Sequence, residues 1–190
     1  LSGQAGYLNA CLVLYRNRPT IDLKTRCQTL AKRIAGMPLC ALGPEFADGL
    51  SGIACSLLRF EATLGITDFR DRALQLLCAA GDELTEPGNN ERSWYRGVVG
   101  LAVAQIEAAR RTGAERFEIE AALGRSLALL DGHAAFALDD VSFGEAGRAY
   151  LLYRAAEQLN LQAYLRKSEP AYQRLLHRAL AGTLAFGWPS

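Results

Sequence analysis

Apolar positions along the chain recur with a helical period, and no stretch alternates between apolar and polar residues for long enough to indicate a sheet. Four runs are rich in Ala and Leu and contain neither Pro nor Gly, namely residues 7–16, 53–64, 101–111 and 148–159. Each is followed by a short break and a second, more charged run, at residues 23–34, 68–84, 115–130 and 161–184. We expect Pro170 to interrupt the last of these. The pattern predicts an all-α protein built from pairs of helices.

A glycine motif opens each pair at nearly constant spacing. Gly-x-x-Gly begins at Gly3, Gly49, Gly97 and Gly144, at intervals of 46, 48 and 47 residues. Small residues let neighbouring helix ends approach closely and leave backbone N–H groups unpaired at the start of the helix. We therefore expect four helix-hairpin repeats of about 47 residues, at about 1–46, 47–94, 95–141 and 142–190.

Repeated helix pairs stack into a solenoid or curl into a toroid. The first helix of each pair is the richer in Ala, Gly and Leu, so it is expected in an inner layer. The second carries more charge and is expected in an outer, solvated layer. The predicted architecture is an α/α toroid, or part of an α/α barrel.

Composition narrows the class of protein. Lys and Arg number 21 and Asp and Glu 20, for a net charge of +1, which favours neither nucleic acid nor an anionic membrane as a partner. No apolar run approaches the roughly 20 residues of a membrane span. The five cysteines, an odd number without a Cys-x-x-Cys pair, include Cys11, Cys55 and Cys78 within apolar helical runs. We expect buried free thiols and a reducing, cytoplasmic location.

The residues around the glycines resemble those of a known protein family. They read ADGLSGI at 47–53, SWYRGVVG at 93–100 and SFGEAG at 142–147. This register resembles the lanthionine synthetase C-like family, α/α-toroid cyclases that close thioether rings in lanthipeptides. In that family the segments open on Ala-His-Gly, Trp-Cys-x-Gly and Cys-His-Gly, and Trp94 is the most specific single match.

The departures from the family pattern concern its zinc site. Tyr95 stands where the family has a Cys, and Ser142 and Phe143 stand where it has Cys-His. The acid/base histidine of the family falls on Asp48. Because Tyr, Ser and Phe do not form the soft site that zinc prefers, the resemblance implies a member without a metal or other cofactor.

That pattern is similar to the cyclase domains of class III lanthipeptide synthetases, which lack the zinc ligands and follow kinase and phospho-Ser/Thr lyase domains in one polypeptide. The family ring also needs more helix pairs than four. The resemblance thus implies that these 190 residues are a fragment of a larger multidomain chain, or that identical chains complete the ring.

The reaction so implied adds a Cys thiol of a dehydrated precursor peptide to dehydroalanine or dehydrobutyrine, giving (methyl)lanthionine or labionin rings. Without a metal, a protein still holds thiol and alkene in reach, places a cation near the developing enolate and moves the proton with a carboxylate. The candidate catalytic residues, all near the repeat glycines, are Asp48, Tyr95, Arg96 and Glu145. The candidate substrate-binding residues are Trp94, Asp140 and Ser142.

Other interpretations stay open. The capping preference of Asp favours a second role for Asp48, as the N-cap of the inner helix. A lone arginine such as Arg96 is more often a surface ion-pair partner. A second interpretation of the whole chain is a toroid that has lost catalysis and binds a peptide or acts as a scaffold. An unrelated glycoside-processing toroid would need two cavity-facing acids, and the sequence offers no convincing second carboxylate beside Asp48.

Overall fold

The computed structural model describes residues 3–84, 93–111, 116–131, 138–141, 144–159 and 162–186. Within these ranges the chain is helical, with no strand. The elements are α1 (Gln4–Asn17), α2 (Ile21–Ala35), the 3₁₀ turn η1 (Leu39–Ala41), α3 (Leu50–Leu64), α4 (Arg70–Leu84), α5 (Val98–Ala109), α6 (Arg116–Asp131), α7 (Glu145–Leu159) and α8 (Gln162–Leu180).

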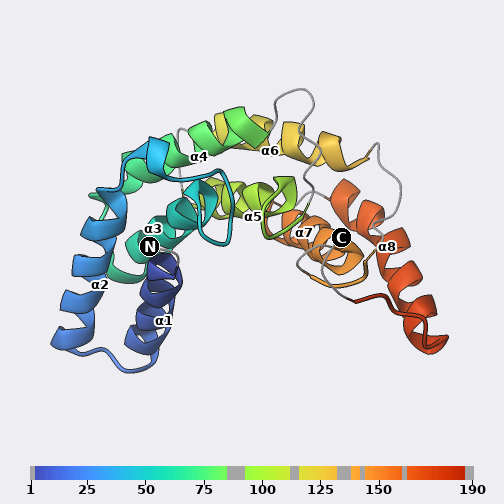
Figure 1. Cartoon of the computed structure of the whole chain (residues 1–190), viewed down its shortest axis with the longest axis horizontal. Coiled ribbons are helices and arrows are strands. Elements are labelled where there is room, and N and C mark those ends of the chain that lie inside the picture. Colours follow the sequence, from blue (N-terminus) through green and yellow to red (C-terminus); the bar gives the residue numbers. More distant parts are fainter. Residues whose placement is uncertain are drawn as a thin grey trace.

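The helices form a two-layered arch (Figure 1). The inner layer is α1, α3, α5 and α7, each in contact with the next, and the outer layer is α2, α4, α6 and α8, each packed on its own partner. This arrangement confirms the predicted all-α fold and its assignment of inner and outer helices. It is the architecture of an α/α toroid.

The core lies between and within these layers, which explains the compositions of the two kinds of helix. In α5, eleven of twelve residues are buried, because helices cover it on several sides. In α2 only three of fifteen are buried, along one stripe. Small apolar residues allow the close approach of inner helices, whereas the outer helices keep their charged side chains in water.

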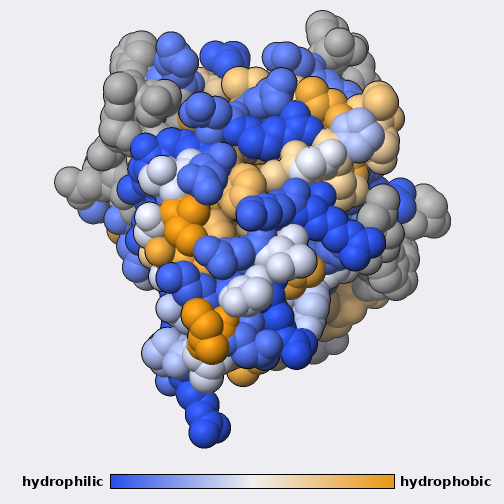
Figure 2. Space-filling model, turned by 90° about the vertical axis from the view of Figure 1, so that its left-hand side faces the viewer, coloured by the Kyte–Doolittle hydropathy of each residue, from blue (hydrophilic) through white to orange (hydrophobic). Residues whose placement is uncertain are grey.

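The N-terminal end of the arch is chemically mixed. Figure 2 shows this face with apolar residues interspersed among hydrophilic ones. The N-terminal helix α1 has Tyr7, Val13 and Leu14 exposed. Among the helices described, none combines the length and the apolar content that a membrane crossing demands.

Two local predictions are corrected. The inner helices begin earlier than expected, inside the glycine motif, with Gly3, Gly49 and Gly97 as N-cap residues. Pro170 does not interrupt the last helix, since α8 is continuous through it. Tertiary contacts hold α8 on both sides of the proline, because Ser168 and Ala171 are buried and the helix packs along α7.

The cysteines follow the expectation in part. All five are free; Cys11, Cys27 and Cys55 are buried, whereas Cys40 and Cys78 are exposed. The prediction of burial is therefore wrong for Cys78, because it lies on the solvent-facing side of the outer helix α4. Burial raises the pKa of the Cys55 thiol to about 11, which makes this thiol unreactive at neutral pH.

Candidate functional site

The loops that precede the inner helices fold back over the helix starts. Before α3, the N–H of Leu50 donates to the carbonyl oxygen of Gly43 at 2.8 Å. Before α7, the N–H of Glu145 donates to the carbonyl oxygen of Leu138 at 3.0 Å. The two bonds occupy equivalent positions in their repeats, so one loop geometry recurs at this end of the inner layer.

The second glycine of the motif makes this geometry possible. A Cβ added to Gly52, Gly100 or Gly147 would lie 1.8, 2.2 or 2.1 Å from the carbonyl oxygen of the residue six positions earlier. No side chain fits at such distances. The repeated glycines therefore mark positions where a loop crosses directly over its own helix.

Neighbouring loops are joined to each other. The carbonyl oxygen of Tyr95 accepts hydrogen bonds from the N–H groups of Phe46 and Ala47, both at 3.2 Å. The rings of Phe46 and Trp94 pack with centroids 4.8 Å apart, a distance typical of a favourable aromatic pair. The loops before α3 and α5 thus form one connected surface.

This connection brings three of the predicted catalytic residues into neighbouring positions. Asp48 and Arg96 each follow the hydrogen-bonded residues by one position, and both are exposed. Tyr95 is half-buried, with the Arg96 guanidinium 5.7 Å from its ring centroid. A carboxylate, a phenol and a cation therefore lie at the same end of the inner helices.

The capping interpretation of Asp48 is wrong. The N-cap of α3 is Gly49, and no side chain caps this helix. The ion-pair interpretation of Arg96 also lacks support, because in the described part of the chain no carboxylate lies within ion-pair distance of it. The backbone N–H of Arg96 donates a hydrogen bond to Ser93 Oγ at 2.9 Å.

A small cleft of about 10 Å³ opens beside Asp48, between α1, the end of α2 and the start of α3. It is lined by Gln4, Met37 and Ile53, among others. The Gln4 side-chain oxygen is buried and has no hydrogen-bond partner among the described residues. An acceptor oxygen beside a carboxylate suits the N–H groups of a peptide. No sequence motif marks Gln4, because only the packing of α1 against α3 brings it there.

Glu145 lies apart from this exposed surface. It is 1% exposed, forms an ion pair with Arg174 of α8, and has Arg148 Nη1 at 3.9 Å. This placement favours a structural role, the docking of α8 onto α7, over the catalytic role expected from its position in the motif.

The remaining predicted residues have different surroundings. Trp94 is half-buried and packs against Phe46, and Asp140 is half-buried in the loop before α7. Ser142 lies outside the described residues. The neighbour of Asp140, Asp139, is 3% exposed and accepts hydrogen bonds from Arg178 at 2.7 Å and from the N–H of Ala185 at 2.8 Å. Asp139 thus holds the segment after α8 against the loop before α7. No sequence motif indicated this contact.

The residues present do not fit a zinc ion. Tyr95 stands at one of the family's ligand positions and has the charged guanidinium of Arg96 over its ring, where a second cation would be repelled. Ser142 and Phe143 supply no soft donor. Among the residues described, no three His, Cys, Asp or Glu side chains gather as a metal site would require.

Repeated helix pairs and glycine-marked loops over the inner helices define a protein with an α/α-toroid fold. The family model described as "Lanthionine synthetase C-like protein" matches residues 41–186. The chain belongs to this family, which implies lanthionine cyclase-type function on peptide substrates and sets aside the glycoside-processing alternative. No curated protein matches the chain.

Proposed function

We propose that this domain catalyses, without a metal, the intramolecular addition of a peptide Cys thiol to dehydroalanine or dehydrobutyrine. The observation that carries the proposal is the pair of hydrogen bonds from Phe46 and Ala47 to the Tyr95 carbonyl. These bonds join the loop that carries Asp48 to the loop that carries Tyr95 and Arg96, and both Asp48 and Arg96 are exposed there.

The reaction forms one C–S bond and transfers one proton from the thiol to the α-carbon. The sulfur bonds to the β-carbon of the alkene, the π pair moves toward the α-carbon and its carbonyl oxygen, and the α-carbon then gains the proton that the thiol has lost. A thiol with a pKa near ~8.5 is mostly protonated at neutral pH. A carboxylate that accepts this proton and a cation beside the enolate oxygen both lower the barrier.

Each of the three residues has a role in this scheme. Asp48 takes the thiol proton and returns it to the α-carbon. Arg96 stabilises the enolate, and the Tyr95 hydroxyl donates a hydrogen bond to the same oxygen or to the peptide. The half-buried Trp94 and Asp140 contribute to the surface over which the peptide lies.

The test is ring closure in a dehydrated, Cys-containing peptide, followed by counting alkylatable thiols over time in the presence of a chelator. We expect Asp48→Asn to slow closure about a hundredfold and Arg96→Gln about tenfold. Asp22→Asn and Arg166→Gln, at exposed positions of outer helices, are the matched controls and should leave the rate unchanged. Loss of activity on chelation would contradict the metal-free reaction.

A second candidate is a toroid that holds the peptide and no longer catalyses. It is favoured by the residues at the family's metal positions, which supply no donor set, and by the use of Glu145 in a buried ion pair. Thiol loss no faster with the protein than without it, together with retained peptide binding, would establish this alternative.

The class III assignment belongs to the same proposal, as do kinase and lyase domains in the same polypeptide and a labionin product. The sequence on either side of these residues tests the first two. Mass spectrometry of the closed peptide distinguishes lanthionine from labionin. A cytoplasmic location is proposed from the free cysteines, and fractionation with an antibody tests it.

A further inference from the structure

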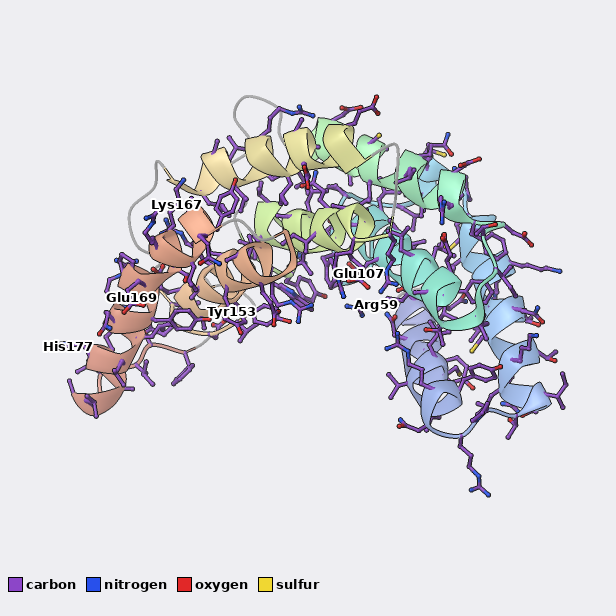
Figure 3. The ribbon with its side chains drawn as sticks, turned by 180° about the vertical axis from the view of Figure 1, so that it is seen from behind. Arg59, Glu107, Tyr153, Lys167, Glu169 and His177 are labelled. Atoms are coloured by element: carbon purple, nitrogen blue, oxygen red, sulfur yellow. The ribbon has the colours of Figure 1, made fainter. Side chains whose placement is uncertain are left out.

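The concave side of the arch carries arginines gathered about a single carboxylate. Glu107 of α5 is 8% exposed. Its carboxylate oxygens lie 3.8 Å from Arg59 Nε of α3 and 3.6 Å from Arg110 Nη1, and they also bind Arg111. Figure 3, viewed from behind, shows Arg59 and Glu107 pointing together into the hollow of the arch.

One carboxylate does not neutralise three guanidinium groups. Burial alone would raise the pKa of Glu107, but the hydrogen bond from Arg111 and the charges of Arg111, Arg59 and Arg110 outweigh it and lower that pKa below its usual value. The carboxylate is thus ionised at neutral pH, and the cluster keeps a net positive charge. The side chains of Arg59 and Arg110 are each 43% exposed, so this charge faces water.

A small pocket lined in part by Tyr150 adjoins the cluster. A space of about 30 Å³ lies between α3, α5 and α7, lined by Arg59, Val103, Ile106, Glu107, Tyr150 and Arg154. The Arg154 guanidinium is 5.9 Å from the Tyr150 ring centroid. Tyr150 and Tyr153, on α7, are 43% and 41% exposed. Exposed Tyr and Arg around an apolar floor are the residue types enriched where proteins bind partners.

We propose that this cationic face binds an acidic segment of the peptide that the glycine-marked loops process. Its excess charge comes from Arg59, Arg110 and Arg111 around Glu107. Tyr150 and Arg154, whose Nε lies 3.8 Å from Glu157, complete its lining. The identity of the bound chain as the substrate rests on the proposed function. The charge excess selects Asp and Glu side chains, while Val103 and Ile106 contact the apolar parts of the segment.

The distance between the cationic face and the glycine-marked loops predicts how far the acidic segment lies from the reacting residue of the peptide. Arg59 lies ten residues beyond Gly49 in the direction of α3, which corresponds to about 15 Å along the helix. An extended peptide covers this distance with about five residues. The acidic segment should therefore lie about five residues from the reacting Cys or dehydroamino acid.

Fluorescence anisotropy with the whole chain tests the inference. The probe is a fluorescein-labelled peptide with four consecutive Glu residues five positions before a Ser and a Cys, and its counterpart carries Gln in place of each Glu. We expect the acidic probe to bind and the Gln probe to bind at least tenfold more weakly. Binding should also weaken steeply as salt is raised to about 0.3 M, because exposed charges are screened.

Variants locate the site. Arg59→Gln and Arg110→Gln should each weaken binding of the acidic probe about threefold to fivefold, and the double variant more. Arg26→Gln, at an exposed arginine of the outer helix α2, is the matched control and should change nothing. Thermal unfolding of each variant verifies that it is folded.

The inference is overturned by equal binding of the two probes, by binding that Arg59→Gln and Arg110→Gln leave unchanged, or by stronger binding of a single-stranded RNA of equal charge. The probe contains no dehydroamino acid, so the measurement does not depend on catalysis. A protein that closes rings with no preference for acidic peptides would keep the proposed function and lose this inference.

Discussion

The glycine motif has different surroundings at the N-terminal end and at the centre of this arch. At the centre, a Cβ added to Gly100 would lie 2.2 Å from the Trp94 carbonyl oxygen and 2.5 Å from the Phe46 Cβ. In α1, a Cβ added to Gly3 or Gly6 would meet nothing within 4 Å among the described residues. Among the residues described, a crossing loop thus requires the second glycine of the motif in the second, third and fourth repeats.

The contacts at the centre join the loops of two neighbouring repeats. In the centre, Phe46 and Trp94 hold equivalent positions, three residues before the first glycine of their motifs, and pack on each other. Phe46 also lies over Gly100 of the next repeat. The contacts between loops, which carry the candidate site, therefore depend on glycine at the centre.

The largest expected effect comes from filling the central glycine. Gly100→Ala should lower the free energy of unfolding by about 2–3 kcal/mol, because backbone and the Phe46 side chain must both move. Gly6→Ala should raise it by about 0.5–1 kcal/mol, since alanine is the better helix former and the space is open. Urea unfolding of the two variants measures both. Equal effects would remove the distinction between edge and centre.

A smaller effect is expected from the buried carboxylate of the central region. Glu107→Gln should cost about 1–2 kcal/mol, discounted because its arginine partners are partly exposed. The lowered pKa of Glu107 means that its contribution is complete above the unfolded value of about 4.3 and is lost as the pH falls through the folded value. The variant should therefore show a shallower loss of stability than wild type below about pH 5.

Asp22 provides the comparison at the edge of the arch. It pairs with Arg26 one turn later on α2, at 2.9 Å, and its side chain is 70% exposed. Asp22→Asn should change stability by less than about 0.5 kcal/mol. If the free energy of unfolding of Glu107→Gln varies with pH as that of wild type does, the central ion pairs contribute nothing to stability.

The smallest effect concerns the contact between the two regions. The Asn9 side-chain nitrogen of α1 donates to Ser56 Oγ of α3 at 2.9 Å, while the Asn9 side-chain oxygen is buried without a partner among the described residues. Asn9→Ala removes a hydrogen bond and an unsatisfied acceptor together, so the cost should be only about 0.5–1 kcal/mol. Asn17→Ala, which loses an exposed bond to the Val13 carbonyl oxygen, is the control and should cost less. A cost above that of Gly100→Ala would place the main constraint at the edge.

Much of the fold was predictable from local pattern. The period of the apolar residues and the spacing of the glycines predicted the helix pairs, their layers and the end at which the loops gather. The errors were local: helix starts inside the motif, a continuous helix through Pro170 and an exposed Cys78. In each case packing with other elements outweighed the preference of a single residue.

The candidate site was predictable only as a set of positions. The sequence placed Asp48, Tyr95, Arg96 and Glu145 next to repeat glycines without distinguishing them. The structure separates them, since Asp48 and Arg96 are exposed on joined loops whereas Glu145 is buried against Arg174. Arg59 and Glu107 lie 48 residues apart in the sequence, and no motif marks them as neighbours.

The sequence by itself determined the helical repeat, the alternation of inner and outer helices and the family, because these follow from periodicity and from residues close together in the chain. Only the tertiary structure decided which glycines are sterically required, which acids face water and which arginines share one carboxylate. Those properties depend on distances between atoms of different repeats, which arise when the helices pack and which no local stretch of residues encodes.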